Sequence, residues 1–231
     1  GHYYTLNNIF MENIKVKNNI NLLKYTTIKI GGYTEFFAEP ESIAELIEYL
    51  KWAKLNNYKY RIIGAGSNLL IKNTFHHGLT ICTKKLKKIA INKLSGFLEA
   101  ECGVMLPIMA NILARNGCEG GEWLIGVPGT IGGAVFMNAG SGKLWISKYL
   151  LSVKVLDTKD LSIYKLDKEN LIFKYRFSSF QTNKLAILTA TFKFEPNKNI
   201  KKIIDKTQQI LKKKRNTQPY HLPSFGSVFK N

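Results

Sequence analysis

The stretch that most constrains the fold is GGEWLIGVPGTIGGAVFMNAGSG, at residues 120–142. It places eight glycines among 23 residues. Glycine weakens helices and strands, so this stretch is incompatible with a long regular element. Glycine also lets a ligand approach the main chain closely. The stretch therefore predicts a site built largely from backbone.

A second glycine loop, Gly64–Asn68, follows a short apolar strand expected at Tyr60–Ile63 and precedes the apolar run Leu69–Ile71. The loop does not match the GxGxxG fingerprint of dinucleotide-binding proteins, because Leu69 stands where that fingerprint has its last glycine. No GxxxxGK[ST] motif occurs in the chain. The N–H groups of this loop and of residues 126–133 could face one anionic ligand. A diphosphate-containing cofactor held between two lobes is one interpretation, and plain tight turns are the other.

Periodicity predicts the elements around these loops. Apolar spacing indicates helices over residues 41–57, 106–116 and 200–214. Residues 149–156 and 161–166 flank a polar turn and are expected to form a hairpin, and residues 185–194 another strand. The organisation expected is a lobe over residues 1–83, a second over 84–195, and the start of a third segment over 196–231.

The chain carries a formal net charge of +18, which raises the possibility of a basic nucleic-acid-binding module. Lysine supplies nearly all of the positive charge, and arginine occurs only at Arg61, Arg115, Arg176 and Arg215. Base and bidentate phosphate recognition favour arginine, so a nucleic-acid role is not expected. A lysine-rich surface would also attract an anionic small substrate.

The cysteines and the hydropathy indicate where the chain resides. Cys82, Cys102 and Cys118 have neither CxxC nor metal-ligand spacing, so reduced, buried thiols, no metal site and a cytoplasmic location are expected. Neither a membrane-length apolar run nor an export signal is found in the sequence. No membrane association is expected.

Five segments follow one another along the chain: YTTIKIGG (25–32), IGAGSNLLI (63–71), GVPGTIGGAVFMNAG (126–140), FKYRFSSF (173–180) and PSFGSVFKN (223–231). In this order they resemble the UDP-N-acetylenolpyruvoylglucosamine reductase family. The resemblance implies an α+β, two-lobed FAD-binding fold of the vanillyl-alcohol-oxidase/PCMH type, followed by the start of a substrate-binding α+β domain. It also implies non-covalent FAD, NADPH as hydride donor, and reduction of the enolpyruvyl group of a UDP-sugar in peptidoglycan precursor synthesis.

The same resemblance assigns the cofactor-binding residues. The FAD diphosphate would be wrapped by Gly64, Ala65, Gly66, Ser67 and Asn68 from one side, and by Gly129, Thr130, Gly132 and Gly133 from the other. In such proteins the cofactor carries the chemistry and the protein orients it.

The resemblance also implies catalytic and substrate-binding residues, in the segments FKYRFSSF and PSFGSVFKN. Arg176 resembles the family's arginine that stabilises an enolate-like intermediate, a task that suits a rigid guanidinium. Ser227 resembles the family's serine that protonates this intermediate. Tyr175 is expected to lie beside Arg176 on a strand, where neighbours alternate faces, so one of the two would only be packed. Lys230 and Asn231 match family positions near the substrate, and Arg215 and Gln218 fit substrate binding near the UDP diphosphate or a place near the flavin. For Lys212–Lys214, a solvated helix end fits equally well.

The family also places a catalytic glutamate well past the serine motif, and this sequence stops before such a segment. A C-terminally incomplete enzyme that holds FAD but reduces its substrate poorly is therefore expected. The alternative within the same fold is an oxidase that attaches FAD through a histidine, for which His76 and His77 lie near a glycine loop. A monomer is expected.

Overall fold

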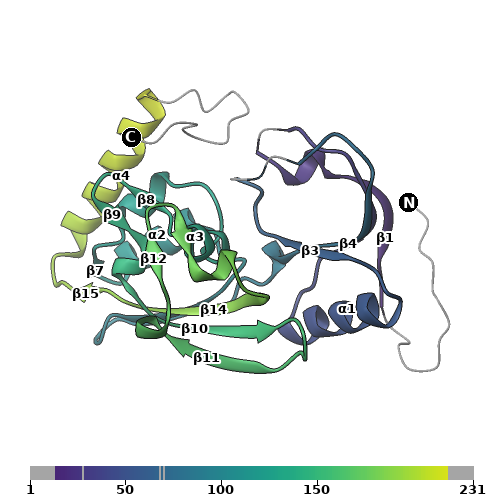
Figure 1. Ribbon diagram of the computed structural model, residues 1–231. Coiled ribbons are helices and arrows are strands. Elements are labelled where there is room, and N and C mark those ends of the chain that lie inside the picture. The colour runs from purple at the N-terminus through teal and green to yellow at the C-terminus, as the bar shows by residue number, and fades with distance from the viewer. Residues whose placement is uncertain (1–13, 28, 68, 70, 218–231) are drawn as a thin grey trace. The chain divides into compact units, whose positions relative to one another are not determined.

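The computed structural model describes residues 14–27, 29–67, 69 and 71–217 (Figure 1). These residues divide into two compact units, the first up to Leu86 and the second from Lys87 onward. The purple-to-blue part of the ribbon is the first unit, and the teal-to-yellow part is the second.

The first unit is built on a mixed four-stranded sheet in the order β1-β2-β4-β3. β1 is antiparallel to β2, whereas β2, β4 and β3 run parallel. The predicted strand at residues 60–63 is confirmed as β3. The strands and the short 3-10 helices of this unit are β1 (Lys17–Asn21), η1 (Leu22–Tyr25), β2 (Tyr33–Ala38), β3 (Tyr60–Ile63), β4 (His76–Cys82) and η2 (Thr83–Lys85).

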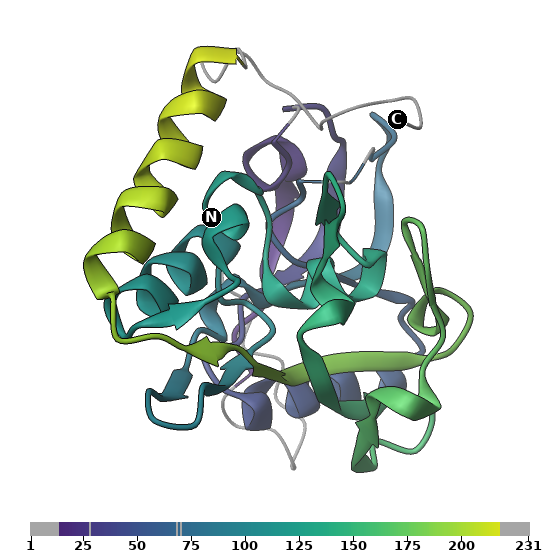
Figure 2. The ribbon, with the colours of Figure 1, turned by 90° about the vertical axis from the view of Figure 1, so that its left-hand side faces the viewer.

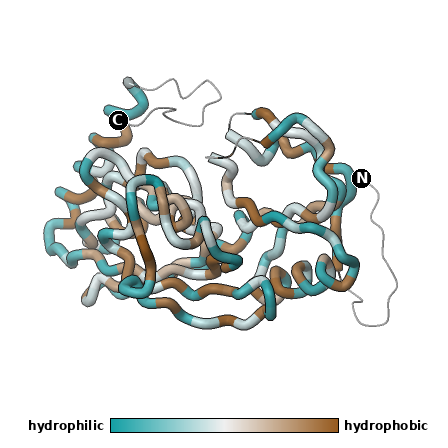
Figure 3. Tube along the Cα trace, in the orientation of Figure 1, coloured by the Kyte–Doolittle hydropathy of each residue, from teal (hydrophilic) through white to brown (hydrophobic). Residues whose placement is uncertain are grey.

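Helix α1 (Ile43–Leu55) connects β2 to β3 and confirms the helix predicted over residues 41–57. It begins where the Ser42 hydroxyl accepts a hydrogen bond from the Glu45 N–H at 3.1 Å, a typical N-cap. It ends before Asn57, whose φ of 56° cannot continue a helix. Hydrophobic and hydrophilic residues alternate around α1 (Figure 3), and its apolar face buries Leu46 and Leu50.

The second unit contains an antiparallel five-stranded sheet in the order β11-β10-β14-β6-β5. The predicted hairpin is confirmed as β10 and β11, and the predicted strand at residues 185–194 as β14. The five strands are β5 (Ile89–Asn92), β6 (Phe97–Glu101), β10 (Leu150–Asp157), β11 (Ile163–Asp167) and β14 (Leu185–Lys193).

Helices α2 (Leu106–Arg115) and α4 (Ile200–Thr217) confirm two further predictions, with α4 extending past its predicted end. α4 lies beside α2 and beside the 3-10 helix η3 (Glu122–Gly126), as Figure 2 shows for the two helices. The glycine stretch also contains the short helix α3 (Ile131–Met137), which the glycine count alone did not predict.

Short pairs of strands and single 3-10 turns complete the second unit. The pairs are β7 (Cys118–Glu119) with β15 (Glu195–Pro196), β8 (Gly140–Ser141) with β9 (Leu144–Trp145), and β12 (Phe173–Lys174) with β13 (Phe177–Ser178). The turns are η4 (Ile146–Lys148), η5 (Lys168–Asn170) and η6 (Ser179–Gln181). One continuous apolar core, which includes Leu98, Leu124, Ile131 and Phe192, joins the sheet to the glycine stretch.

Candidate functional site

The glycine loop of the first unit is held against the segment that begins at Tyr25. Gly66 has a φ of 67°, and a Cβ at this position would lie 2.0 Å from the Tyr25 carbonyl oxygen. Thr27 donates to the Gly66 carbonyl through its backbone N–H at 3.3 Å and its hydroxyl at 3.4 Å. Two motifs that lie about forty residues apart in the sequence therefore form one structure, and only glycine fits at Gly66.

Ser67 leaves a polar atom of this loop unpaired. Within the described residues, its hydroxyl oxygen is buried and makes no hydrogen bond. Buried hydroxyls nearly always have a partner, because an unpaired one costs about 1–3 kcal/mol. A phosphate oxygen is a suitable acceptor, so the loop fits a diphosphate-containing cofactor. Asn68, which completes the predicted set, lies outside the described residues.

The glycine loop of the second unit differs from its prediction. Three of the N–H groups that were expected to face an anion already donate within the protein: Ile131 to the Val104 carbonyl at 2.8 Å, Gly132 to the Cys102 carbonyl at 2.8 Å, and Gly133 to the Thr130 hydroxyl at 3.3 Å. Gly132 is also needed for packing, since a Cβ there would lie 2.9 Å from the Cys102 Cβ. The expectation that these N–H groups are available to a ligand was wrong.

The surface over this loop remains accessible at Gly133. A Cβ at Gly133 would meet only the Thr130 hydroxyl oxygen, at 3.6 Å. Gly129 has a φ of 117°, a conformation that L-residues rarely adopt. The exposed backbone at Gly133 can therefore contact a cofactor, whereas Gly132 packs against Cys102 inside the protein.

Tyr175 and Arg176 form the two-residue turn between β12 and β13, in which Lys174 pairs with Phe177. The expected alternation on a strand was wrong, because neither residue lies within a strand. Arg176 has a φ of 52°, which is uncommon for a large side chain. Its guanidinium donates to the Gly140 carbonyl at 3.1 Å and lies 5.3 Å from the centre of the Tyr175 ring. Both side chains are exposed at the tip of the hairpin.

The hairpin is attached to the C-terminal end of α3. The Ser178 hydroxyl donates to the Phe136 carbonyl at 2.6 Å, and the Gln181 amide donates to the same oxygen at 3.1 Å. α3 has seven residues and is therefore about 10 Å long, with the glycine loop before its first residue and the hairpin attached near its last. Within the second unit, α3 thus brings together two motifs that were predicted to carry different functions.

Asn138 is a supporting residue that was missed in the sequence, although it lies in the quoted segment 126–140. It caps α3 in the left-handed conformation, with a φ of 46°. Its amide nitrogen donates to the Lys174 carbonyl at 2.9 Å, and its amide oxygen accepts from the Ser147 N–H at 3.4 Å. The sequence signal that could have identified it is an asparagine directly after the apolar run at residues 134–137, because asparagine is one of the few residues that adopt the left-handed conformation of a helix cap.

We expect Asn138→Ala to lower the free energy of unfolding by roughly 2–4 kcal/mol, because it leaves buried backbone groups unpaired and strains the cap. Asn138→Gly is the matched control, since it loses the same hydrogen bonds without the strain and should cost about 1–2 kcal/mol less than Ala. Urea unfolding followed by tryptophan fluorescence measures both. Equal losses for Ala and Gly would contradict a contribution from the left-handed cap.

The basic end of α4 also differs from expectation. A solvated helix end was one of two alternatives for Lys214, and it does not hold, because the side chain is half-buried and donates to the Gly126 carbonyl at 2.9 Å. This burial lowers the pKa of the Lys214 amine below its usual value. Arg215, the predicted substrate residue next to it, is exposed. Gln218, Ser227, Lys230 and Asn231 lie outside the described residues.

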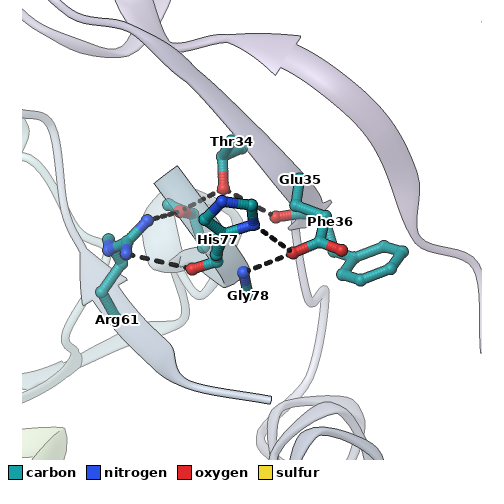
Figure 4. A network of polar contacts seen from close by, with 7 residues as sticks. Thr34, Glu35, Phe36, Arg61, His77 and Gly78 are labelled. Carbon is teal, nitrogen blue, oxygen red and sulfur yellow. Dashed lines mark hydrogen bonds and ion pairs between the residues drawn. The ribbon is translucent and has the colours of Figure 1, made fainter. Parts of the chain in front are cut away.

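The two histidines near the first glycine loop take part in local contacts. His76 lies with its Nε2 at 2.9 Å from the Lys72 carbonyl oxygen, and His77 Nδ1 lies 3.5 Å from a Glu35 carboxylate oxygen. The same Glu35 oxygen accepts from the Gly78 N–H at 2.8 Å (Figure 4). Arg61 completes the network by donating to the His77 carbonyl at 3.3 Å. These contacts join the first residues of β2, β3 and β4.

The three cysteines are buried and reduced, as expected. Burial raises the pKa of the Cys82 and Cys118 thiols, so their reactive thiolate forms are disfavoured at neutral pH. Across residues 14–217, as far as they are described, neither a helix that could span a membrane nor a cluster of metal-ligating side chains is found.

Comparison with known proteins defines the class first. Residues 34–166 match the family model of the FAD binding domain. Together with the glycine loop at Gly66 and the unpaired Ser67 hydroxyl, this match makes the chain an FAD-dependent flavoprotein. The expected flavin cofactor and α+β FAD-binding fold are confirmed.

The particular family follows from the relatives. A UDP-N-acetylenolpyruvoylglucosamine reductase of Prochlorococcus marinus subsp. pastoris (strain CCMP1986 / NIES-2087 / MED4) is 58% identical over 221 residues, which are 96% of this chain and 75% of the relative. The chain belongs to the UDP-N-acetylenolpyruvoylglucosamine reductase family, and the expected resemblance is confirmed.

Solved structures agree with this assignment. The crystal structure of UDP-N-acetylenolpyruvylglucosamine reductase (MurB) from Thermus caldophilus is similar with a TM-score of 0.74 and 28% identity, covering 94% of this chain and 74% of that one. BBE-like 1 of Physcomitrella patens is similar with a TM-score of 0.55 at 15% identity, covering 71% of this chain and 37% of that one. The second likeness concerns the fold alone.

Proposed function

We propose that this chain reduces the enolpyruvyl group of UDP-N-acetylenolpyruvoylglucosamine to give UDP-N-acetylmuramate, a peptidoglycan precursor, with NADPH as the electron source. The observation that carries the proposal is the strained Arg176 turn attached to α3 in a chain whose relative is 58% identical. Strained residues of this kind concentrate at functional sites.

The cofactor residues are proposed on the geometry of each loop. In the first unit, Gly64, Ala65, Gly66, Ser67 and Asn68 would contact the FAD diphosphate, with the unpaired Ser67 hydroxyl as a donor. In the second unit, Gly129, Thr130, Gly132 and Gly133 would form the other contact surface. When bound, FAD supplies hydride transfer.

Arg176 would stabilise the charge that develops on the substrate. Hydride arrival at the terminal carbon of an enolpyruvyl group leaves negative charge delocalised into the neighbouring carboxylate. A guanidinium held by the Gly140 carbonyl is a fixed cation for this charge, and it needs no reorganisation during the reaction. Tyr175 would confine the guanidinium from one side through its ring.

The remaining assignments stay predictions on the sequence motifs. Ser227 would return a proton to the substrate carbon next to the carboxylate, and Arg215, Gln218, Lys230 and Asn231 would contact the UDP-sugar. We further propose that residues 1–83 and 84–195 act as two FAD-binding lobes and that residues 196–231 begin a substrate-binding domain. The reduced cysteines support a cytoplasmic location, and a monomer is proposed.

The test is a visible absorption spectrum of the FAD-loaded chain, followed by anaerobic addition of NADPH and then of the UDP-sugar. We expect bleaching with NADPH and recovery of the flavin absorbance with the substrate. Bleaching by simple alcohols instead of NADPH, with reoxidation by oxygen but not by the UDP-sugar, would favour another oxidoreductase of the same fold. A chain that cannot be loaded with FAD would contradict the proposal.

We expect Ser227→Ala to leave FAD binding and NADPH-driven bleaching intact while slowing substrate-driven reoxidation by about 10²-fold or more, because a positioned general acid contributes about 10²–10⁴-fold. Stopped-flow absorbance separates the two half-reactions. Equal slowing of both half-reactions would contradict a proton-donating role for Ser227.

A further inference from the structure

The loop between η3 and α3 is fastened by the protein at both of its ends. At its C-terminal end the Leu106 N–H donates to the Gly129 carbonyl at 3.0 Å, and the Ile131 N–H donates to the Val104 carbonyl at 2.8 Å. At its N-terminal end the contact comes from Lys214 of α4, which donates to the Gly126 carbonyl at 2.9 Å. Only Val127 and Pro128 lie between these attachments.

The contact between Lys214 and Gly126 is more than one hydrogen bond. The aliphatic part of the lysine lies across the glycine, so that a Cβ at Gly126 would approach the Lys214 Cδ to 2.4 Å and its Cε to 3.0 Å. Among the described residues, no carboxylate forms an ion pair with Lys214. The ammonium therefore donates its hydrogen bond to a backbone carbonyl at the start of the glycine loop. Burial lowers the pKa of this amine.

A second lysine of α4 attaches to the other end of η3. Lys206 lies 3.0 Å from the Glu122 carboxylate, which is only 4% exposed and also accepts the Gly120 N–H at 2.9 Å. Lys206 and Lys214 are eight residues apart, or about 12 Å along a helix. α4 thus contacts both the first and the last residue of η3.

We propose that Lys214 is a positioning residue that holds the Gly126–Thr130 loop in its cofactor-binding conformation and thereby couples the docking of α4 to FAD affinity. The inference rests on the proposed contact of this loop with FAD. It assigns a role to the end of α4 that differs from substrate binding by the exposed Arg215.

The first test uses the protein without FAD. In Lys214→Met, which keeps the aliphatic stem but loses the ammonium, we expect faster amide hydrogen exchange over residues 122–130. Suitable probes are the N–H groups of Leu124 and Val127, which donate to the Gly121 and Leu124 carbonyls. Exchange in β10 should not change. Lys213→Met is the matched control, because Lys213 is exposed on the same helical turn. Unchanged exchange over residues 122–130 would overturn the proposal.

The second test measures FAD affinity by titrating each apoprotein and following flavin fluorescence. We expect Lys214→Met to raise the dissociation constant roughly tenfold, the effect of one charge-assisted hydrogen bond, and Lys213→Met to leave it unchanged. An unchanged constant in Lys214→Met would overturn the coupling. Failure of the wild-type chain to bind FAD would instead contradict the proposed function, and the wild-type titration alone reveals it.

A double-mutant cycle separates positioning from general destabilisation. Gly126→Ala places a methyl group where the lysine stem lies, and its φ is not in the left-handed region, so the flexible side chain moves at little cost to the backbone. If both changes act through one contact, the double variant should bind FAD no more than about twofold more weakly than either single variant. Effects that multiply would overturn the proposal.

Discussion

Arg176→Ala is expected to slow substrate-driven flavin reoxidation by about 10²–10³-fold, the typical effect of removing one preorganised group that stabilises developing charge. NADPH-driven bleaching and FAD affinity should stay near the wild-type values. The reason is that the guanidinium lies exposed at the tip of the hairpin and is fixed there by the Gly140 carbonyl. Stopped-flow measurement of the two half-reactions, together with an FAD titration, tests this expectation.

Two control variants separate chemistry from folding at this position. Arg176→Gly accommodates the left-handed φ of 52° without strain, so it should retain the turn and still lose substrate reduction. Arg176→Lys keeps the charge but not the planar fork, so its rate should lie between those of the wild type and the alanine variant. Loss of bound FAD in all three variants would contradict the assignment of Arg176 to the substrate.

Gly66→Ala is expected to lower the free energy of unfolding by roughly 2–4 kcal/mol, because left-handed strain is combined with a severe backbone contact. The new Cβ would lie 2.0 Å from the Tyr25 carbonyl oxygen and 2.9 Å from the Thr26 Cα, and neither atom belongs to a flexible side chain. Because the loop must move, FAD affinity should fall on the order of tenfold to a thousandfold, given that 1.4 kcal/mol corresponds to a factor of ten.

Gly142→Ala is the matched control for this variant. Gly142 has a φ of 63°, close to that of Gly66, but a Cβ there would meet nothing within 4 Å. It should therefore show only the left-handed strain of about 1–2 kcal/mol and no change in FAD affinity. Urea unfolding and FAD titration of both variants provide the comparison. Equal destabilisation by the two substitutions would show that the contact with Tyr25 does not matter.

Steric exclusion also explains why the motif at Tyr25 accompanies the glycine loop. Thr27 donates two hydrogen bonds to the Gly66 carbonyl, so the segment that begins at Tyr25 packs directly against the glycine loop. The close contact with Gly66 is made by the Tyr25 carbonyl and not by its side chain. The burial of its hydroxyl nevertheless raises the pKa of Tyr25, which keeps the side chain neutral.

The predictions that succeeded rest on short-range physics. Helix α1 could be read from apolar spacing and flanking residues, and β3 from four residues before a glycine turn. The hairpin of β10 and β11 followed from two apolar runs around a polar turn. The resemblance of five ordered segments identified the family and its cofactor, because five motifs in one order are far more specific than any single motif.

The predictions that failed concerned groups whose state is set by distant residues. Tyr175 and Arg176 were expected to lie on a strand, but the pairing of Lys174 with Phe177 makes them the turn of a hairpin, which Ser178 attaches to the Phe136 carbonyl. Nothing local showed that the N–H of Gly132 is already taken by the Cys102 carbonyl.

By itself, the sequence determined helices α1, α2 and α4, strand β3, the hairpin of β10 and β11, strand β14, the glycine loops and the flavoprotein family. Helical periodicity, glycine content and motif order are properties of adjacent residues. Only the tertiary structure decided which N–H groups of the second glycine loop already donate within the protein, which lysine of α4 is half-buried, and why Gly66 must be glycine. Those properties arise where segments tens of residues apart come into contact, and the energy of such a contact depends on distances that the order of residues does not specify.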